Sequence, residues 1–304
     1  MVWQKPMCGV VRCLVAALWI GVLALAPPAA RAQEAPRGYQ RILSDAPHAF
    51  RYTGPGEPAR RGLRAERFEL RDGDCSGADC GAPRYRAEIG ERRPAARVGQ
   101  DIWIGWSFFN GSIGPTLRDV SLRIVLGQWR MSGDVPPVFR LVQIGRDEGN
   151  WADCQPLFCF APGDPVEDVV VQLPDMAQAL NWGRAQNQGH ICRLFSTVAA
   201  RDHWMDIVVN TNFAEDDSGY LRIWVNDALK CDYRGRLVAS RPGRWARPEH
   251  RRGIFASYTE RWDEVQPDVP KPRLLAYFDE VRQGRSREEV DVRYRLRAGL
   301  KPVD

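Results

Sequence analysis

The chain has 304 residues, with 43 Lys and Arg side chains, 38 Asp and Glu side chains and a formal net charge of +5. Three basic residues lie in the first 32 positions, and without them the balance is 40 against 38, so bulk charge does not support a nucleic-acid partner. The 44% apolar content allows a buried core, and the remaining length fits one large β domain.

Residues 1–32 have the features of a secretory signal peptide. Lys5 and Arg12 come before the apolar run LVAALWIGVLALA, and an A-x-A sequence at positions 30–32 precedes Gln33. The apolar run is too short for a comfortable membrane span, so we expect no stable membrane anchor; an uncleaved anchor is the alternative. The sequence therefore predicts a periplasmic or secreted protein with a single domain over residues 33–304.

Strand-like segments with turn signals between them follow in chain order. Many alternate apolar and polar residues, as in GYLRIWVND, where Leu221, Ile223 and Val225 share one face. Only residues 174–186 suggest a short helix. These features predict an all-β, antiparallel β-sandwich or jelly roll of the concanavalin-like kind, whose concave face would bind a long ligand. The expected strands are 62–71, 84–91, 101–109, 121–130, 138–145, 166–173, 205–213, 219–227, 252–258 and 273–284.

Six cysteines lie outside the predicted signal peptide, and an even number in an exported chain favours disulfides. Fifteen pairings are possible, so the pairing stays open, but spacing suggests Cys75 with Cys80, Cys154 with Cys159, and Cys192 with Cys231. Metal ligation by the thiolates is the alternative. Because two C-x4-C spacings match zinc sites poorly, we expect no metal.

Two strand segments present arginine and glutamate on the face opposite their apolar residues. In RYRAEIGE, Ala87 and Ile89 face the core, so Arg86 and Glu88 face the other way; ERFELR presents Arg67 in the same manner. Such rows form either cross-strand ion pairs on a wet sheet or a surface for a polyanionic or uronate-bearing chain.

The segment RIVLGQWR changes character along its length. Strict alternation puts Ile124 and Leu126 on the same face as Gln128 and Arg130. An amide and a guanidinium at the end of an apolar strand face indicate contact with a ligand.

The order of these segments resembles that of a known family. It comprises the Arg-x-Glu strands, the aromatic strand WIGWSFF, the Gln-Trp strand, WMDIVV, GYLRIWVN, the GIF strand and the closing YFDEVRQG. Over residues 60–284 this order is similar to that of the heparin lyase I-like, or glucuronan lyase-like, polysaccharide lyases, which have a β-jelly-roll fold.

The resemblance implies β-elimination of a uronate-containing acidic polysaccharide. We expect a monomer, although the sequence does not fix the oligomeric state. Removing the proton next to a carboxylate leaves negative charge there, which an amide, an arginine or a histidine can neutralise. A tyrosine or histidine can act as the base and as the acid for the departing glycosidic oxygen. No metal or other cofactor is required by this scheme.

Several family positions carry other residues in this chain. The glutamine of the family's Gln-Trp-His strand matches Gln128, and Arg130 occupies the histidine position; the Arg-x-Glu strand matches Arg86 and Glu88. Within EHRRGIF, Glu249 occupies the position of the tyrosine and Arg251 that of the lysine. The resemblance therefore leaves the proton-transfer role to a substitute. The candidates are His203, His250 and Tyr258, of which His250 and Tyr258 are preferred.

The leading hypothesis is an active lyase, and the alternatives are a non-catalytic glycan-binding module on the same fold and a glycoside hydrolase. A hydrolase needs two facing carboxylates, and the E-x-D-x-x-E strand motif typical of sandwich hydrolases is absent from the sequence. The predicted site comprises the catalytic residues Gln128, Arg130, His250 and Tyr258 and the substrate-binding residues Arg67, Arg86, Glu88 and Arg251.

Overall fold

The computed structural model describes residues 1, 33–43, 45–117, 122–143, 165–180 and 189–303. The description below concerns the unit of residues 31–304. The predicted signal peptide and the predicted Cys154–Cys159 pair lie outside the described residues.

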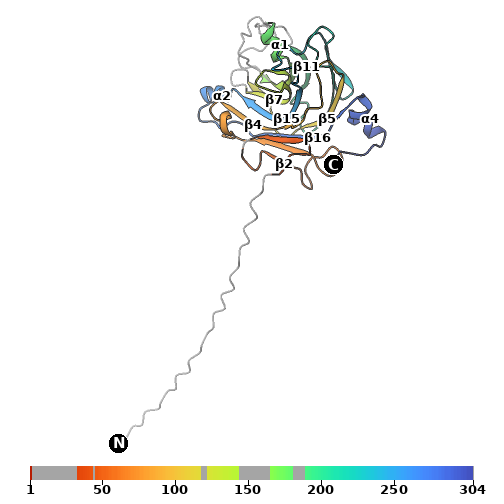
Figure 1. The fold of residues 1–304 in the computed structure, drawn as a ribbon. Coiled ribbons are helices and arrows are strands. Elements are labelled where there is room, and N and C mark those ends of the chain that lie inside the picture. The colour runs from red at the N-terminus through yellow and green to blue at the C-terminus, as the bar shows by residue number, and fades with distance from the viewer. Residues whose placement is uncertain (2–32, 44, 118–121, 144–164, 181–188, 304) are drawn as a thin grey trace. The chain divides into compact units, whose positions relative to one another are not determined.

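Two seven-stranded antiparallel sheets form a β-sandwich, so the predicted all-β jelly-roll class is confirmed (Figure 1). In spatial order the first sheet contains β1 (Tyr39–Leu43), β4 (Arg84–Glu91), β15 (Pro248–Ser257), β7 (Arg123–Met131), β8 (Pro137–Gln143), β10 (Asp168–Gln172) and β11 (His190–Ser196). The second contains β14 (Ala228–Arg234), β13 (Tyr220–Val225), β12 (Trp204–Thr211), β5 (Ile102–Asn110), β16 (Leu274–Gly284), β3 (Glu66–Leu70) and β2 (Phe50–Tyr52).

The remaining elements are short. A two-stranded sheet pairs β6 (Thr116–Leu117) with β9 (Pro165–Val166). The helices are the 3₁₀ turn η1 (Gly77–Asp79), α1 (Pro174–Ala179), α2 (Glu260–Val265), α3 (Arg287–Val290) and α4 (Val292–Arg297). In the described ranges, no helix has both the length and the apolar character that a membrane crossing needs.

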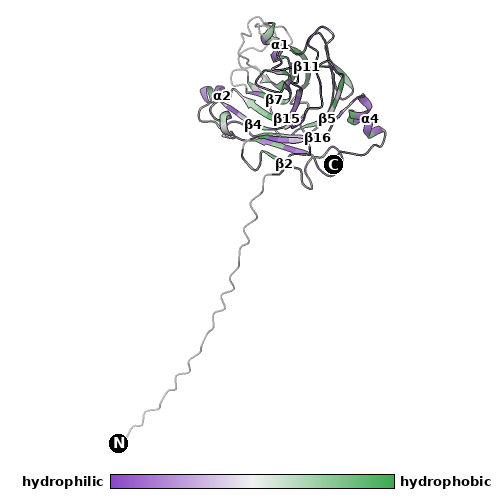
Figure 2. Cartoon of the chain, viewed as in Figure 1, coloured by the Kyte–Doolittle hydropathy of each residue, from purple (hydrophilic) through white to green (hydrophobic). Residues whose placement is uncertain are grey.

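The core lies between the sheets and is built from the alternating residues that the sequence predicts. Leu221, Ile223 and Val225 of β13 are at most 3% exposed, while the residues between them are half-buried. Phe68 of β3 and Ile89 of β4 are fully buried in the same core. Strands of both sheets accordingly mix green apolar and purple polar residues along their length (Figure 2).

A β-bulge in β7 changes which face its last residues occupy. Strict alternation would keep Ile124 on the face of Gln128 and Arg130, but the pairing register with both neighbouring strands shifts between Val125 and Gly127. Ile124 is part of the core, whereas Gln128 and Arg130 line a cleft on the outer face of the first sheet. The extra residue of the bulge thus turns the two polar side chains outward.

The bulge has a counterpart at Gly253 in the neighbouring strand β15. Gly253 has φ +126°, and a Cβ atom there would collide with the carbonyl oxygen of Ala87 in β4. Glycine is the residue that tolerates both this backbone conformation and this close approach.

Two of the three predicted disulfides are present. Cys75–Cys80 closes a small loop before β4, and Cys192–Cys231 joins β11 of the first sheet to β14 of the second.

Candidate active-site cleft

A cleft of about 470 Å³ lies on the outer face of the first sheet, over β4, β15, β7 and β8. Its walls come from these strands, from the turn between β7 and β8, and from the start of α2. The lining residues are Ala82, Pro83, Arg84, Arg86, Arg123, Gln128, Arg130, Asp134, Val135, Pro136, Pro137, Arg140, Phe255, Ser257, Tyr258 and Glu260. Four residues of the predicted site, at positions 86, 128, 130 and 258, therefore meet in one cleft.

The cleft is rich in arginine. In the part of the chain that the structure describes, five arginines line it against two carboxylates, those of Asp134 and Glu260. Arg130 has no carboxylate within ion-pair distance among the described residues, and its Nη2 atom donates a hydrogen bond to the Val135 carbonyl oxygen at 3.3 Å. Burial and the nearby Arg251 charge lower the pKa of Arg130. An anionic ligand would relieve this excess of positive charge.

Gln128 is held from below by a buried carboxylate. Its Nε2 atom donates to Oε1 of Glu88 at 2.7 Å, and both side chains are 1% exposed. Burial raises the pKa of Glu88, against the opposing effect of the Arg86 charge. Gln128 thus forms part of the floor of the cleft, with one amide hydrogen already used by the protein.

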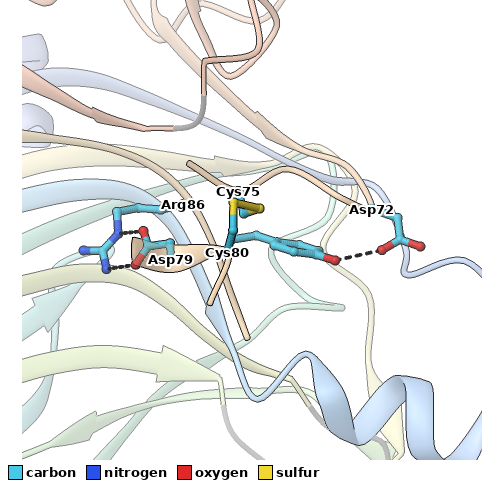
Figure 3. The surroundings of a disulfide bond; sticks show 6 residues. Asp72, Cys75, Asp79, Cys80 and Arg86 are labelled. Atoms are coloured by element: carbon cyan, nitrogen blue, oxygen red, sulfur yellow. Dashed lines mark hydrogen bonds and ion pairs between the residues drawn. A yellow bond between two sulfur atoms is a disulfide. The ribbon is translucent and has the colours of Figure 1, made fainter. Parts of the chain in front are cut away.

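Arg86 is clamped between two carboxylates. Its Nε and Nη2 atoms donate to the two oxygens of Asp79 at 2.8 and 3.1 Å (Figure 3). Its Nη1 atom donates to Glu88 at 3.4 Å. The guanidinium lies 4.4 Å from the centre of the Phe255 ring. Its side chain remains 11% exposed toward the cleft.

Tyr258 follows β15 directly, with a left-handed φ of +63°. Its hydroxyl accepts a hydrogen bond from Nη1 of Arg123 at 3.0 Å. The guanidiniums of Arg123 and Arg261 lie 4.4 and 3.8 Å from the ring centre. A non-glycine residue with positive φ is uncommon and is often found at functional sites. Tyr258 therefore presents a phenol oxygen in the cleft beside two cations.

His250, which the sequence analysis names as a catalytic candidate, does not line the cleft. His250 is 1% exposed, and its ring stacks on Trp129 at 4.7 Å inside the sandwich. Burial and the Arg252 charge lower the pKa of His250 well below its usual range. His250 alternates in step with the core residues Ile254 and Ala256, and this pattern in the sequence indicates an inward side chain.

Arg67 and Arg251 also lie outside the cleft. Arg67 belongs to β3, which pairs with β16 and β2 in the second sheet, and it forms an ion pair with Glu69. Arg251 lies opposite Gln128 in the first sheet but is paired with Glu249, with Nε and Oε1 2.7 Å apart. Alternation predicts the face of a strand, but it does not predict which sheet the strand joins.

Three further arginines of the cleft, Arg84, Arg123 and Arg140, were not predicted as site residues. Arg140 lies between the core residues Phe139 and Leu141, so the same alternation could have placed it on the outer face. Arg84 and Arg123 begin β4 and β7, where alternation is a weaker guide.

The chain is similar in fold to solved structures of carbohydrate-active enzymes. An endo-β-1,4-glucuronan lyase from the fungus Trichoderma reesei is 15% identical, with a TM-score of 0.48 over 85% of this chain and 95% of that one. The PL7 alginate lyase AlyA1 from Zobellia galactanivorans is 12% identical, with a TM-score of 0.45 over 72% and 77%. The catalytic domain of a glycoside hydrolase family 131 protein from Coprinopsis cinerea is 12% identical, with a TM-score of 0.48 over 84% and 86%.

Comparison with curated proteins finds no match. The family described as polysaccharide lyase matches residues 40–282, which extend from β1 to β16 and include the whole cleft. The chain therefore belongs to the polysaccharide lyase family.

Proposed function

We propose that the chain cleaves a uronate-containing acidic polysaccharide by β-elimination in the arginine-rich cleft. The observation that carries this proposal is the meeting of Gln128, Arg130 and Tyr258 in one cleft, on a chain of the polysaccharide lyase family. A uronate carboxylate would supply the ion-pair partner that Arg130 lacks among the described residues.

Neutralisation of the carboxylate is the first requirement of the reaction. As the proton leaves the carbon next to the carboxylate, negative charge spreads onto the carboxylate oxygens. Arg130 would face this charge, and the remaining amide hydrogen of Gln128 would donate to one oxygen. Because Glu88 holds Gln128 at 2.7 Å, the amide needs little reorganisation as the charge develops.

Proton transfer would use Tyr258. The Tyr258 phenolate would take the proton as a base, the electron pair of the broken C–H bond would form the C=C bond, and the glycosidic C–O bond would break with its electron pair left on the departing oxygen. The same oxygen then returns the proton to the leaving oxygen, so protons and electrons balance. The guanidiniums of Arg123 and Arg261 would stabilise the negative charge on the phenol oxygen in the first half of this step.

The other arginines of the cleft would bind neighbouring residues of the polymer. Arg84 and Arg140 lie in the same cleft as Arg130, so a chain with a carboxylate on successive sugars would find a cation at more than one position. Export of the protein is part of this proposal, because the Cys75–Cys80 and Cys192–Cys231 disulfides suit an oxidising compartment.

The test is a product screen on alginate, glucuronan, heparan and chondroitin polymers. β-Elimination creates a double bond conjugated to the carboxylate, so ultraviolet absorbance should rise with one of these polymers and not with a neutral glucan. New reducing ends without a rise in absorbance would indicate hydrolysis and contradict the proposal.

A non-catalytic glycan-binding module is the second candidate. It is favoured by the burial of His250 and by the lack of any histidine among the described residues that line the cleft. Retardation of the protein in a gel that contains an acidic polymer, without any rise in absorbance on incubation, would select the module over the lyase.

A further inference from the structure

The loop of residues 71–83, which precedes β4, has no buried side chain that packs against the sandwich. No residue from 71 to 86 is buried, and η1 contains no buried side chain. The loop is tied instead by polar contacts at its base, where Asp74 accepts from His48 at 2.7 Å and Asp72 accepts from Tyr85 at 3.1 Å. Beyond these contacts, the Cys75–Cys80 disulfide closes the turn that contains Asp79.

Asp79 extends from this closed turn to Arg86, which lines the cleft. Its two carboxylate oxygens accept from Nε and Nη2 of Arg86, which is the two-point geometry that fixes both the distance and the plane of a guanidinium. Figure 3 shows the pair beside the disulfide, with Asp79 directly before Cys80. The orientation of a cleft arginine is therefore set by a residue one position away from a cystine.

A count of the hydrogen-bond donors of Arg86 shows which of them remain for a ligand. A guanidinium has five N–H donors. Two are used by Asp79 and one by Glu88, so one N–H on each Nη nitrogen remains. A pair of donors on the two Nη nitrogens suits a carboxylate or a sulfate, and Phe255 supports the guanidinium plane from one side.

We infer that Asp79 is a positioning residue for substrate binding and that the Cys75–Cys80 disulfide holds it in place. Through Asp79, the closed Cys75–Cys80 turn orients Arg86 so that its remaining donors can bind an acidic sugar. This inference rests on the proposed function, because it assigns Arg86 to substrate binding in the same cleft.

Loss of the Asp79–Arg86 ion pair would weaken substrate binding, because a second carboxylate competes for Arg86. Glu88 is fully buried and lies 3.4 Å from Nη1, a longer distance than those between Arg86 and Asp79. Without Asp79, the guanidinium would turn toward Glu88, where it compensates a buried charge. Its donors would then point into the floor rather than into the cleft.

The first experiment compares D79A, D79E and R86A on the polymer that the product screen identifies. D79A should raise KM, and the dissociation constant from affinity electrophoresis, about tenfold with little change in kcat, as expected for one charge-assisted contact. D79E, which restores the carboxylate on an exposed turn, should recover most of the affinity. D79A/R86A should be no weaker than R86A alone, because the two residues act through one contact.

The second experiment compares removal of the Cys75–Cys80 disulfide with removal of the Cys192–Cys231 disulfide, which serves as the control. C75S/C80S should reproduce the rise in KM of D79A, and adding D79A to it should change little. C192S/C231S, which opens the cystine between β11 and β14, should lower the melting temperature but leave KM unchanged. A melting curve for each variant separates loss of affinity from loss of folding.

The outcomes distinguish the inference from the proposed function. If R86A weakens binding but D79A or C75S/C80S does not, the positioning role is wrong while the substrate cleft stands. If R86A leaves both KM and the dissociation constant unchanged, Arg86 does not bind substrate and the inference fails, whereas the proposed function, which is carried by Gln128, Arg130 and Tyr258, fails only if the product screen shows no elimination.

Discussion

The amide nitrogen of Gln128 donates to the Glu88 carboxylate across 2.7 Å, and neither side chain is more than 1% exposed. The pair is therefore structural as well as a candidate part of the site. The sequence resemblance assigned Gln128 to the substrate alone, whereas the fold also makes it the partner of a buried acid.

Gln128→Ala should abolish turnover and also lower the free energy of unfolding by about 1–3 kcal/mol, because Glu88 loses a buried donor. Urea titration of the folded protein measures the second effect. In the E88L/Q128L variant both polar partners are removed, so most of the stability should return while turnover stays absent. Full turnover in Q128A would show that the amide does not serve the reaction.

Tyr258→Phe should lower kcat by about 10²- to 10⁴-fold, the usual range for loss of a general acid–base group. KM should change little, because the ring and its contacts with Arg123 and Arg261 remain. Tyr294→Phe on α4 removes a hydroxyl that does not line the cleft, and it should be fully active. An unchanged kcat in Y258F would assign proton transfer to another group.

Two arginine substitutions should separate function from stability. Arg130→Gln should lower kcat/KM about a hundredfold or more, yet leave stability within about 0.5 kcal/mol, because no described carboxylate pairs with it. Arg252→Gln should instead cost about 3–5 kcal/mol, because Arg252 forks onto buried Glu66 with two contacts of 2.6 Å. Kinetics and urea titration of the two variants measure both effects. Equal losses of stability would contradict this division of roles.

Alternation along strands predicted most of the core. Residues 84–91 form β4 as expected, and Ile89, Phe68 and Leu221 are buried where the pattern places them. The pattern works because a sheet with one buried face needs apolar residues at every second position. It also separates Arg86 from Ile89 correctly, and so brings one candidate residue to the cleft.

The parts of the site that could not be predicted depend on contacts between distant segments. The bulge near Gly127 is a one-residue offset against two neighbouring strands, so alternation within β7 cannot reveal it. The place of Arg67 depends on β3 pairing with β16, which is about 200 residues away along the chain. The strands β11 and β14, which the Cys192–Cys231 disulfide joins, were also missed as strands.

The two cystines should differ in their contribution to stability. In the chain-entropy account, the 39-residue separation of Cys192 and Cys231 corresponds to about 4 kcal/mol and the 5-residue separation of Cys75 and Cys80 to about 2 kcal/mol. C192S/C231S should therefore lower the free energy of unfolding more than C75S/C80S in urea titrations at one temperature. The reverse order would show that the small loop stabilises the folded state by more than ring closure.

Asp279 should make stability fall as pH rises from about 4 to about 6. Burial raises the pKa of Asp279 from 3.8 to about 6, against the backbone N–H groups of Arg61, Glu280 and Arg60, which favour the carboxylate. The folded state then binds a proton that the unfolded state has already released. The contribution of protonated Asp279 to the free energy of unfolding is fully present below about pH 4. It is lost as the pH rises to about 6, and the total loss is about 3 kcal/mol.

Glu57 and Glu69 act in the opposite direction at lower pH. Hydrogen bonding from Arg51 lowers the pKa of Glu57 to about 2, and the pKa of Glu69 is also about 2, because its bonds to three arginines outweigh burial. Their contribution to stability is fully present above about pH 4.5 and is lost as pH falls toward 2.

The variant D279N isolates the effect of Asp279, because the substitution leaves both glutamates and Glu88 in place. Urea titrations from pH 4 to 6 should show a steeper fall of stability in wild type than in D279N, which keeps the contribution of buried carboxyls such as Glu88, whatever the variant's constant loss of stability. Parallel pH profiles for the two proteins would show that Asp279 is already ionised at pH 4 in the folded state.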